Sequence, residues 1–246
     1  MNFIFITLFP EIIKASLNES ITKKAIDNSL ITCQVYDPRD YLNERERIDD
    51  KIYGGGPGML LKPEPLKKVL DKVLEKLDKS KSKKIYLSPK GTQFNQKKAE
   101  KLSKEENVIF ICGRYEGIDQ RIIDHYVDEE ISIGDYVLSG GELPALVVFD
   151  AIVRNLKGVL GDESSLEQES FSDGLLEYPQ YTRPEEMTLG KVPKELLSGN
   201  HLEISKWRKK QMLGITALRR KDLLNEEALS KEDKKLLKEF FDELDS

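Results

Sequence analysis

The sequence predicts an α/β protein, with a largely parallel sheet followed by a small helical domain. Strand and helix signals alternate over the first two thirds of the chain, which is typical of parallel strands joined by helices. A polar, acidic segment (GDESSLEQESFS) then lacks apolar periodicity and predicts a linker. Beyond it the periodicity is helical. We therefore divide the chain into an α/β domain (1–160), a linker (161–173) and a helical domain (174–246).

The first domain contains five apolar runs that are short enough to be strands. In order they are Asn2–Thr7, Ile31–Tyr36, Lys84–Ser88, Val108–Cys112 and Val127–Ile133. Helical patterns separate them, at 10–30 with a break near Asn18–Ser20, and at 63–79, 95–103, 117–125 and 141–156. The helix at 63–79 is the clearest, because Leu66, Leu70 and Val73 fall on one stripe with lysines opposite. Residues 37–60 predict a long irregular segment, and the second domain predicts helices at 201–219, 226–230 and 231–244.

Composition narrows the class of protein. No run approaches the roughly 20 apolar residues of a membrane helix, and the N-terminus lacks the basic segment and cleavage site of a signal peptide. Cys33 and Cys112 lie in strand-like runs, which predicts buried free thiols and a reducing cytoplasm. With only His125 and His201 besides them, we expect no zinc site, and His125 is expected to be structural.

Charge is unevenly distributed. The chain carries a net charge of −5, yet residues 198–221 hold seven basic side chains against one acidic one. A local basic patch on an acidic protein suits a structured polyanion bound at one place. The alternative is an ordinary solvated helix face.

Three predicted strands end in unusual loops: IYLSPKG (85–91), FICGRYEGID (110–119) and SIGDYVLSGGELPA (132–145). Ligands of open α/β sheets bind beyond the carboxyl ends of the strands, and glycine lets the backbone approach a ligand closely. Such a pocket suits a nucleoside without phosphates, such as S-adenosylmethionine (SAM), whose sulfonium charge Glu116 would offset. A fourth cluster, KIYGGGPGM (51–59), offers bare backbone that would fit against a base. Taken singly, each loop is better explained by ordinary turn chemistry, whereas the three consecutive strand ends together favour a pocket.

Six stretches carry a resemblance to a known family: YGGGPGM, LSPKG, CGRYEGID, SIGDYVLSGGELPA, ESFSDGLLEYPQYTRP and LLSGNH…WR, in order from Tyr53 to Arg208. Together they resemble the bacterial tRNA (guanine-N1)-methyltransferase family, TrmD. The resemblance implies a SPOUT-type α/β domain with a trefoil knot and a homodimer with active sites at the subunit interface. It implies a tRNA substrate with guanosine at positions 36 and 37, methylated at N1 of the second.

The resemblance also assigns site residues. SAM would be held by Leu87, Ser88, Pro89, Gly113, Glu116, Ile133, Gly134, Asp135, Tyr136, Val137, Leu138, Gly140, Gly141 and Pro144. Expected RNA contacts are Gly55, Gly56, Pro57, Asp119, His201, Lys206, Arg208 and Lys209. A magnesium requirement is implied by the resemblance alone, since the chain shows no clear cage of carboxylates.

The implied catalytic pair is Glu169 and Arg154. Guanine N1 carries a proton, which a carboxylate can remove during methyl transfer, while a guanidinium stabilises the charge that develops on O6. The family often has aspartate where Glu169 stands, and glutamate reaches one methylene further. Without the resemblance, Glu169 is one linker acid among several, and Arg154 is a cation at a helix C-terminus. By the same reasoning Trp207 is expected in the core, and His201 either caps a helix or contacts RNA.

Two other functions are compatible with these patterns. A different SPOUT methyltransferase would act on another RNA position, but the GGGPGM loop and the helical domain argue against it. A non-catalytic RNA-binding factor would keep the basic patch without needing three glycine loops. Binding of SAM would distinguish a methyltransferase of either kind from a non-catalytic RNA-binding factor.

Overall fold

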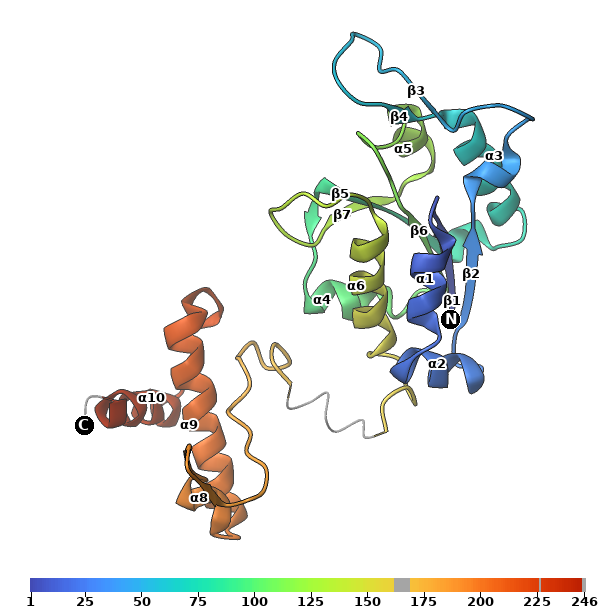
Figure 1. The fold of residues 1–246 in the computed structure, drawn as a ribbon. Helices are drawn as coiled ribbons and strands as arrows, with labels where there is room; N and C mark the ends of the chain where they lie inside the picture. Colours follow the sequence, from blue (N-terminus) through green and yellow to red (C-terminus); the bar gives the residue numbers. More distant parts are fainter. Residues whose placement is uncertain (162–168, 226, 245–246) are drawn as a thin grey trace. The chain divides into compact units, whose positions relative to one another are not determined.

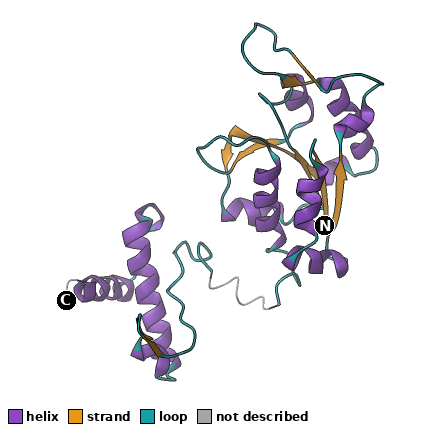
Figure 2. Ribbon diagram, in the orientation of Figure 1, coloured by secondary structure: helices purple, strands orange, loops and turns teal. Residues whose placement is uncertain are grey.

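The computed structural model describes residues 1–161, 169–225 and 227–244 (Figure 1). The chain forms two compact units, Met1–Gly161 and Asp162–Ser246. The first is a sheet with helices on both faces, and the second is mainly helical (Figure 2). In the described part of the chain, no helix combines the length and the apolar character needed to cross a bilayer.

The sheet of the first unit has five strands, and every neighbouring pair is parallel. Its order is β2 (Thr32–Tyr36), β1 (Asn2–Ile6), β6 (Asn107–Ile111), β5 (Ser82–Gln93), β7 (Glu129–Ser132). The predicted parallel α/β architecture is therefore confirmed. Because all five strands run the same way, their carboxyl ends meet at one edge, where a ligand site is expected.

Two layers of helices bury the two faces of this sheet. On one face, α1 (Pro10–Leu17), α2 (Ser20–Asp27), α4 (Gln96–Leu102) and α6 (Glu142–Val153) pack around Phe3, Phe5 and Phe110. On the other, α3 (Pro63–Leu74) and α5 (Gln120–Tyr126) pack around Ile4, Ile6 and Ile109. Alternate residues of β1 thus point to opposite cores, as a strand buried on both faces requires.

Strand β5 departs from the sequence prediction. The apolar run predicts a strand over Lys84–Ser88, whereas the strand extends to Gln93 and contains an irregularity. Leu87 and Thr92 both pair with Ile131, so residues 88–91 bulge out of the ladder. Pro89 cannot donate a ladder hydrogen bond, and Gly91 lies so close to β7 that an added Cβ would be 2.4 Å from the Glu130 carbonyl carbon. The bulge carries Ser88 and Pro89 to the edge where the strands end.

The long segment between β2 and α3 is mostly irregular, as predicted. It contains a short 3₁₀ helix, η1 (Pro38–Tyr41), and an antiparallel pair, β3 (Asp49–Asp50) with β4 (Leu60–Leu61). The glycine-rich loop spans the interval between these two strands. A second 3₁₀ helix, η2 (Lys79–Lys81), follows α3, which ends five residues earlier than predicted.

The second unit is built around α9 (His201–Arg219) and α10 (Lys231–Leu244). Leu175, Met212, Leu213, Leu224 and Leu236 form its core. Before α9 lie a hairpin of β8 (Glu186–Met187) and β9 (Gly190–Lys191) and the short helix α8 (Lys194–Leu197), and after it comes η3 (Lys221–Leu223). The predicted helix at 226–230 is wrong for the described residues 227–230: residues 227–228 form a turn, and residues 229–230 belong to no helix or strand. Residue 226 lies outside the described residues.

Candidate active site

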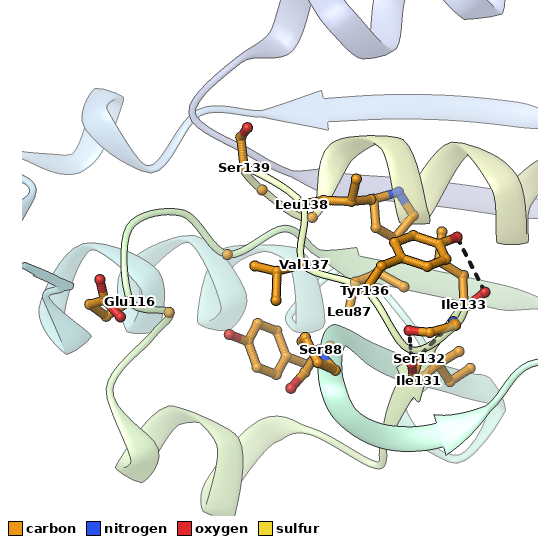
Figure 3. Close-up of a pocket in the computed structure, with 18 of the residues that line it drawn as sticks. Leu87, Ser88, Glu116, Ile131, Ser132, Ile133, Tyr136, Val137, Leu138 and Ser139 are labelled. Atoms are coloured by element: carbon orange, nitrogen blue, oxygen red, sulfur yellow. Dashed lines mark hydrogen bonds between the residues drawn. The ribbon is translucent and has the colours of Figure 1, made fainter. Parts of the chain in front are cut away.

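The bulge of β5 and the loops that follow β6 and β7 enclose one cavity of about 220 Å³, open to solvent (Figure 3). It lies at the carboxyl edge of the sheet, where the sequence places a ligand pocket. Of the fourteen residues expected to hold the cofactor, all but Asp135 line it. The structure adds six lining residues that the sequence analysis did not assign: Tyr86, Tyr115, Gly117, Ile131, Ser132 and Ser139. Each is a neighbour of an assigned residue, so adjacency within the motifs was the available signal.

The wall of the cavity is mainly apolar and backbone. Leu87, Ile131, Ile133 and Leu138 supply its apolar surface, and among the described lining residues Glu116 alone carries a charge. The described wall holds no lysine or arginine, and the cavity suits a neutral ring system carrying a positive centre.

The loop after β7 is shaped by its own hydrogen bonds (Figure 3). Ser132 Oγ donates to the Gly134 carbonyl (3.1 Å) and lies 3.2 Å from the Gly134 amide. Gly134 has φ of +149°, a conformation that favours glycine. The Tyr136 hydroxyl donates to the Ile133 carbonyl at 3.4 Å. These contacts turn the chain sharply at the mouth of the cavity.

The loops after β6 and β7 meet with almost no space between them. The Gly141 amide donates to the Gly113 carbonyl at 2.9 Å, and Arg114 pairs with Gly140 in an isolated antiparallel bridge. A Cβ at Gly141 would lie 2.8 Å from Cys112 Cα. Glycine at 141 is therefore required by the approach of two backbones.

A buried ion pair lies behind this junction, and the sequence analysis missed it. Arg114 Nη2 is 2.9 Å from Glu142 Oε2, and Glu142 is 1% exposed. The other carboxylate oxygen accepts from the Thr7 hydroxyl (2.7 Å), while Arg114 Nη1 donates to the Ser139 carbonyl (3.2 Å). The guanidinium also lies over the Phe9 ring, 4.2 Å from its centroid. The pair thus joins the end of β1, the loop after β6 and the start of α6.

The glycine-rich loop leads directly to this site. Gly54, Gly55 and Gly56 all have positive φ, and an added Cβ at any of them would meet nothing within 4 Å. Further along, Gly58 packs against Glu116, whose Cγ would be 2.5 Å from an added Cβ. The expected RNA contacts Gly55, Gly56 and Pro57 are thus exposed and a few residues from a cavity wall.

Asp119 has a local partner. Its carboxylate caps α5 and accepts from Arg121 Nε (2.8 Å) and Nη2 (2.7 Å), and the Arg121 hydrogen bond lowers the pKa of Asp119. The Arg121 side chain remains 74% exposed. In this arrangement Asp119 orients Arg121, and the guanidinium is the group that faces solvent.

The expected catalytic residues belong to different units. Arg154 follows the last turn of α6 in the first unit. Glu169 lies in the second unit, where its carbonyl accepts from the Ser172 hydroxyl at 2.7 Å. Residues 162–168 of the predicted linker lie outside the described residues.

The basic stretch on α9 divides into exposed and buried members. Lys206 is exposed and Lys209 partly so, whereas Lys210 is 7% exposed and its Nζ lies 2.5 Å from Glu243 on α10. Lys210 is therefore unavailable to a polyanion. Trp207 is 6% exposed, in keeping with the expected core position.

The remaining predictions concern a cap, the thiols and metals. Asn200 caps α9 through its side chain, so the capping role considered for His201 is wrong. Cys33 and Cys112 are free thiols, partly and fully buried. No cluster of three or more histidine, cysteine, aspartate or glutamate side chains suited to a metal occurs in residues 1–161, 169–225 and 227–244.

Comparison with known proteins gives one consistent result. A model of the family described as "tRNA (Guanine-1)-methyltransferase TrmD" matches residues 1–226. A tRNA (guanine-N(1)-)-methyltransferase of Carboxydothermus hydrogenoformans is 53% identical over 245 residues, 99% of this chain and 95% of that protein. Proteins of the same description from Treponema denticola (51%; 99% and 100% covered) and Shewanella amazonensis (50%; 98% and 96% covered) are also similar.

Proposed function

Because this chain belongs to the tRNA (guanine-N1)-methyltransferase family TrmD, we propose that it transfers a methyl group from SAM to N1 of the guanosine at position 37 of tRNA, beside the anticodon. The observation that carries the proposal is the cavity at the carboxyl edge of the sheet. It brings the bulge of β5 and the two glycine-containing loops after β6 and β7 together at one place. A family assignment alone gives the reaction, whereas the cavity gives the place where the methyl donor would bind.

The cavity fits SAM in its chemistry. Backbone groups of the loop after β7 would read the adenine edge, and apolar side chains such as Leu87 and Leu138 would pack on its faces. Glu116, the charged residue of the wall, would offset the sulfonium. When bound, SAM supplies an electrophilic methyl group. The Gly113–Gly141 junction would fix the width of the slot, because neither loop can move toward the other.

Glu169 and Arg154 would perform the proton chemistry. The Glu169 carboxylate would accept the proton of guanine N1, so that the nitrogen lone pair becomes available for the methyl group. The Arg154 guanidinium would stabilise the negative charge that develops on O6. Positioning of N1 in line with the methyl group would supply much of the remaining rate enhancement.

A homodimer is the proposed assembly, with each active site shared between two chains: one chain supplies the cofactor cavity and the other supplies Glu169. An apolar face of the first unit supports it. Phe9, which precedes α1, and Ile12, on α1, are 45% and 36% exposed, and Leu143 and Val147 on α6 are 57% and 50% exposed. The two helices lie side by side (Figure 1). A contiguous apolar face of this kind is usually covered, and a second copy covers it symmetrically. The face adjoins the Arg114–Glu142 pair through Phe9, so the dimer contact would border the cofactor site.

The substrate would be tRNA with guanosine at positions 36 and 37, bound in the cytoplasm. The exposed backbone of the glycine-rich loop, the Arg121 guanidinium and the basic side chains of α9 are the surfaces proposed to contact it. Magnesium stays a prediction of the family resemblance, to be tested by chelation during the assay.

The decisive assay is methyl transfer from labelled SAM to an anticodon stem-loop transcript, followed by identification of the product nucleoside. We expect N1-methylguanosine at position 37 and loss of the product when that guanosine is replaced by adenosine. A label on another position would identify a different RNA methyltransferase. Binding of the transcript without transfer would identify a non-catalytic factor.

A further inference from the structure

The second unit has a cavity of its own, of about 620 Å³, that the proposed chemistry does not use. The extended segment 178–185 forms one side, and residues of α8 and α9 form the other. This segment belongs to the stretch ESFSDGLLEYPQYTRP, whose YPQYTRP part has no assigned role. We call this space the helical-unit cavity.

Arg208 is held at the wall of this cavity by an aromatic ring. Its guanidinium carbon lies 4.7 Å from the centroid of the Tyr178 ring, a cation–π contact that fixes the guanidinium plane. Its Nε is buried and has no hydrogen-bond partner among the described residues. A buried donor without an acceptor is unfavourable, so a ligand oxygen at this point would be stabilised.

Tyr181 adds an exposed aromatic surface to the same cavity. The side chain is 49% exposed, and its ring centroid lies 6.3 Å from that of Trp207. Gln180, Thr182, Arg183 and Glu185 complete the polar lining. A carboxylate beside two arginines argues against a simple anion site. The combination suits a ligand with a flat ring, acidic oxygens and N–H donors.

We infer that the helical-unit cavity binds one unpaired nucleotide of the tRNA substrate, other than the guanosine that is methylated. The base would stack on Tyr181 and the Arg208 guanidinium would contact the phosphate or a base oxygen, which is how proteins read single-stranded RNA loops. Lys206 and Lys209, on the same helix, would meet flanking phosphates. The inference rests on the proposed function for the identity of the RNA.

The chain itself provides a probe for this site, because Trp207 is its single tryptophan. Nucleotide binding beside Tyr181 should change Trp207 fluorescence when an anticodon stem-loop is titrated into the full-length protein. Tyr181→Ala should raise the dissociation constant about tenfold, in the range expected for loss of one stacked base. Tyr181→Phe should bind like wild type, because it keeps the ring. Arg208→Ala should weaken binding and reduce its salt dependence by about one phosphate contact.

Controls separate this cavity from general effects. Phe241→Ala removes another surface aromatic of the same unit, 37% exposed, and Lys235→Ala removes an exposed cation of α10. Both should leave stem-loop affinity unchanged. Methyl-transfer kinetics give a second readout: Tyr181→Ala should raise KM for the stem-loop and leave kcat and SAM affinity near wild type.

Two outcomes would overturn the inference. One is a wild-type dissociation constant for Tyr181→Ala in protein verified as folded by circular dichroism. The other is an equal loss of affinity in Tyr181→Ala and Phe241→Ala. If wild-type protein forms N1-methylguanosine in either case, the proposed function stands and only the cavity assignment fails. Failure of wild-type protein to methylate the stem-loop contradicts the proposed function independently.

Discussion

Replacement of Gly141 by alanine tests whether the junction between the loops after β6 and β7 shapes the cofactor cavity. The residue has φ of −82°, so alanine is compatible with its backbone conformation. The obstacle is space: the new Cβ would lie 2.8 Å from Cys112 Cα and 3.0 Å from the Gly113 amide nitrogen. Since carbon atoms rest about 3.5–4.0 Å apart, the two loops must separate by roughly 0.7 Å or more.

The size of the effect follows from this separation. Overpacking of this kind lowers the free energy of unfolding by about 1–3 kcal/mol. Alanine restricts the unfolded chain more than glycine does, which raises the free energy of unfolding by about 0.4–1 kcal/mol. We expect a net destabilisation of up to about 2.6 kcal/mol, and each kcal/mol lowers Tm by roughly 2–4 °C in a chain of this size. A displacement of this order is close to the 1 Å that can cost about a hundredfold in a well-fitted site, so we expect SAM affinity to fall at least tenfold.

Calorimetric titration with SAM and thermal unfolding measure the two effects on the same preparation. Gly161→Ala is the matched control, because an added Cβ there meets no atom of the described residues within 4 Å. It should bind SAM like wild type. If folded Gly141→Ala protein binds SAM within about twofold of wild type, the junction does not set the width of the cavity and the reasoning is refuted.

Three further predictions concern the ion pair, the basic helix and a thiol. Glu142→Gln leaves the partly buried Arg114 without its counter-charge and should destabilise the protein by about 1–3 kcal/mol in denaturant titrations. Asp128→Asn, at a more exposed pair, should cost less than about 1 kcal/mol. Changing Lys206 and Lys209 together to alanine should reduce the salt-dependence slope of tRNA binding by about 1.4–1.8; an unchanged slope would make this helix face merely solvated. Burial raises the pKa of Cys33 to about 12, so alkylation at pH 8 should be slow until the protein unfolds. The unfolded chain releases this proton at lower pH than the folded one, so stability should fall as pH rises from about 9 toward 12, and a Cys33→Ala variant should lose that part of the decline.

The parallel sheet and the ligand edge could be predicted because the signals are local. Strands β1 and β6 are largely continuous apolar runs, and the loops after β6 and β7 have an unusual density of glycine. Gly113 and Gly141 could be assigned to one pocket before any contact between them was known, since parallel strands end at a common edge. Asp135, in the same loop, points to the limit of this reasoning: a motif places a loop at a cavity without placing every side chain of it there.

The features that the sequence analysis missed depend on contacts between distant residues. Arg114 and Glu142 are 28 positions apart, and neither residue alone differs from an ordinary surface charge. Lys210 belongs to a basic run, and its burial follows from Glu243 on another helix, which no local pattern indicates. The continuation of β5 beyond Pro89 was hidden because a bulge interrupts the ladder and places Gly91 against the neighbouring strand.

A complementation test of mixed dimers addresses the central claim most directly, namely that each active site combines the cofactor cavity of one chain with Glu169 of the other. Glu169→Gln alone should lower single-turnover methylation by about 10²–10⁴, with SAM affinity unchanged. Gly113→Val should block the cavity, because a Cβ at position 113 would lie 2.8 Å from the Tyr86 hydroxyl oxygen. The valine side chain would therefore collide with the Tyr86 ring. The two variants carry different tags, are co-expressed, and are purified as mixed dimers.

In a shared arrangement, one site of the mixed dimer carries both changes and the other carries neither. We therefore predict recovery of about half the activity of the wild-type dimer, one intact site of two. Verified mixed dimers that recover no activity would show that each site is built from a single chain, and would contradict the account.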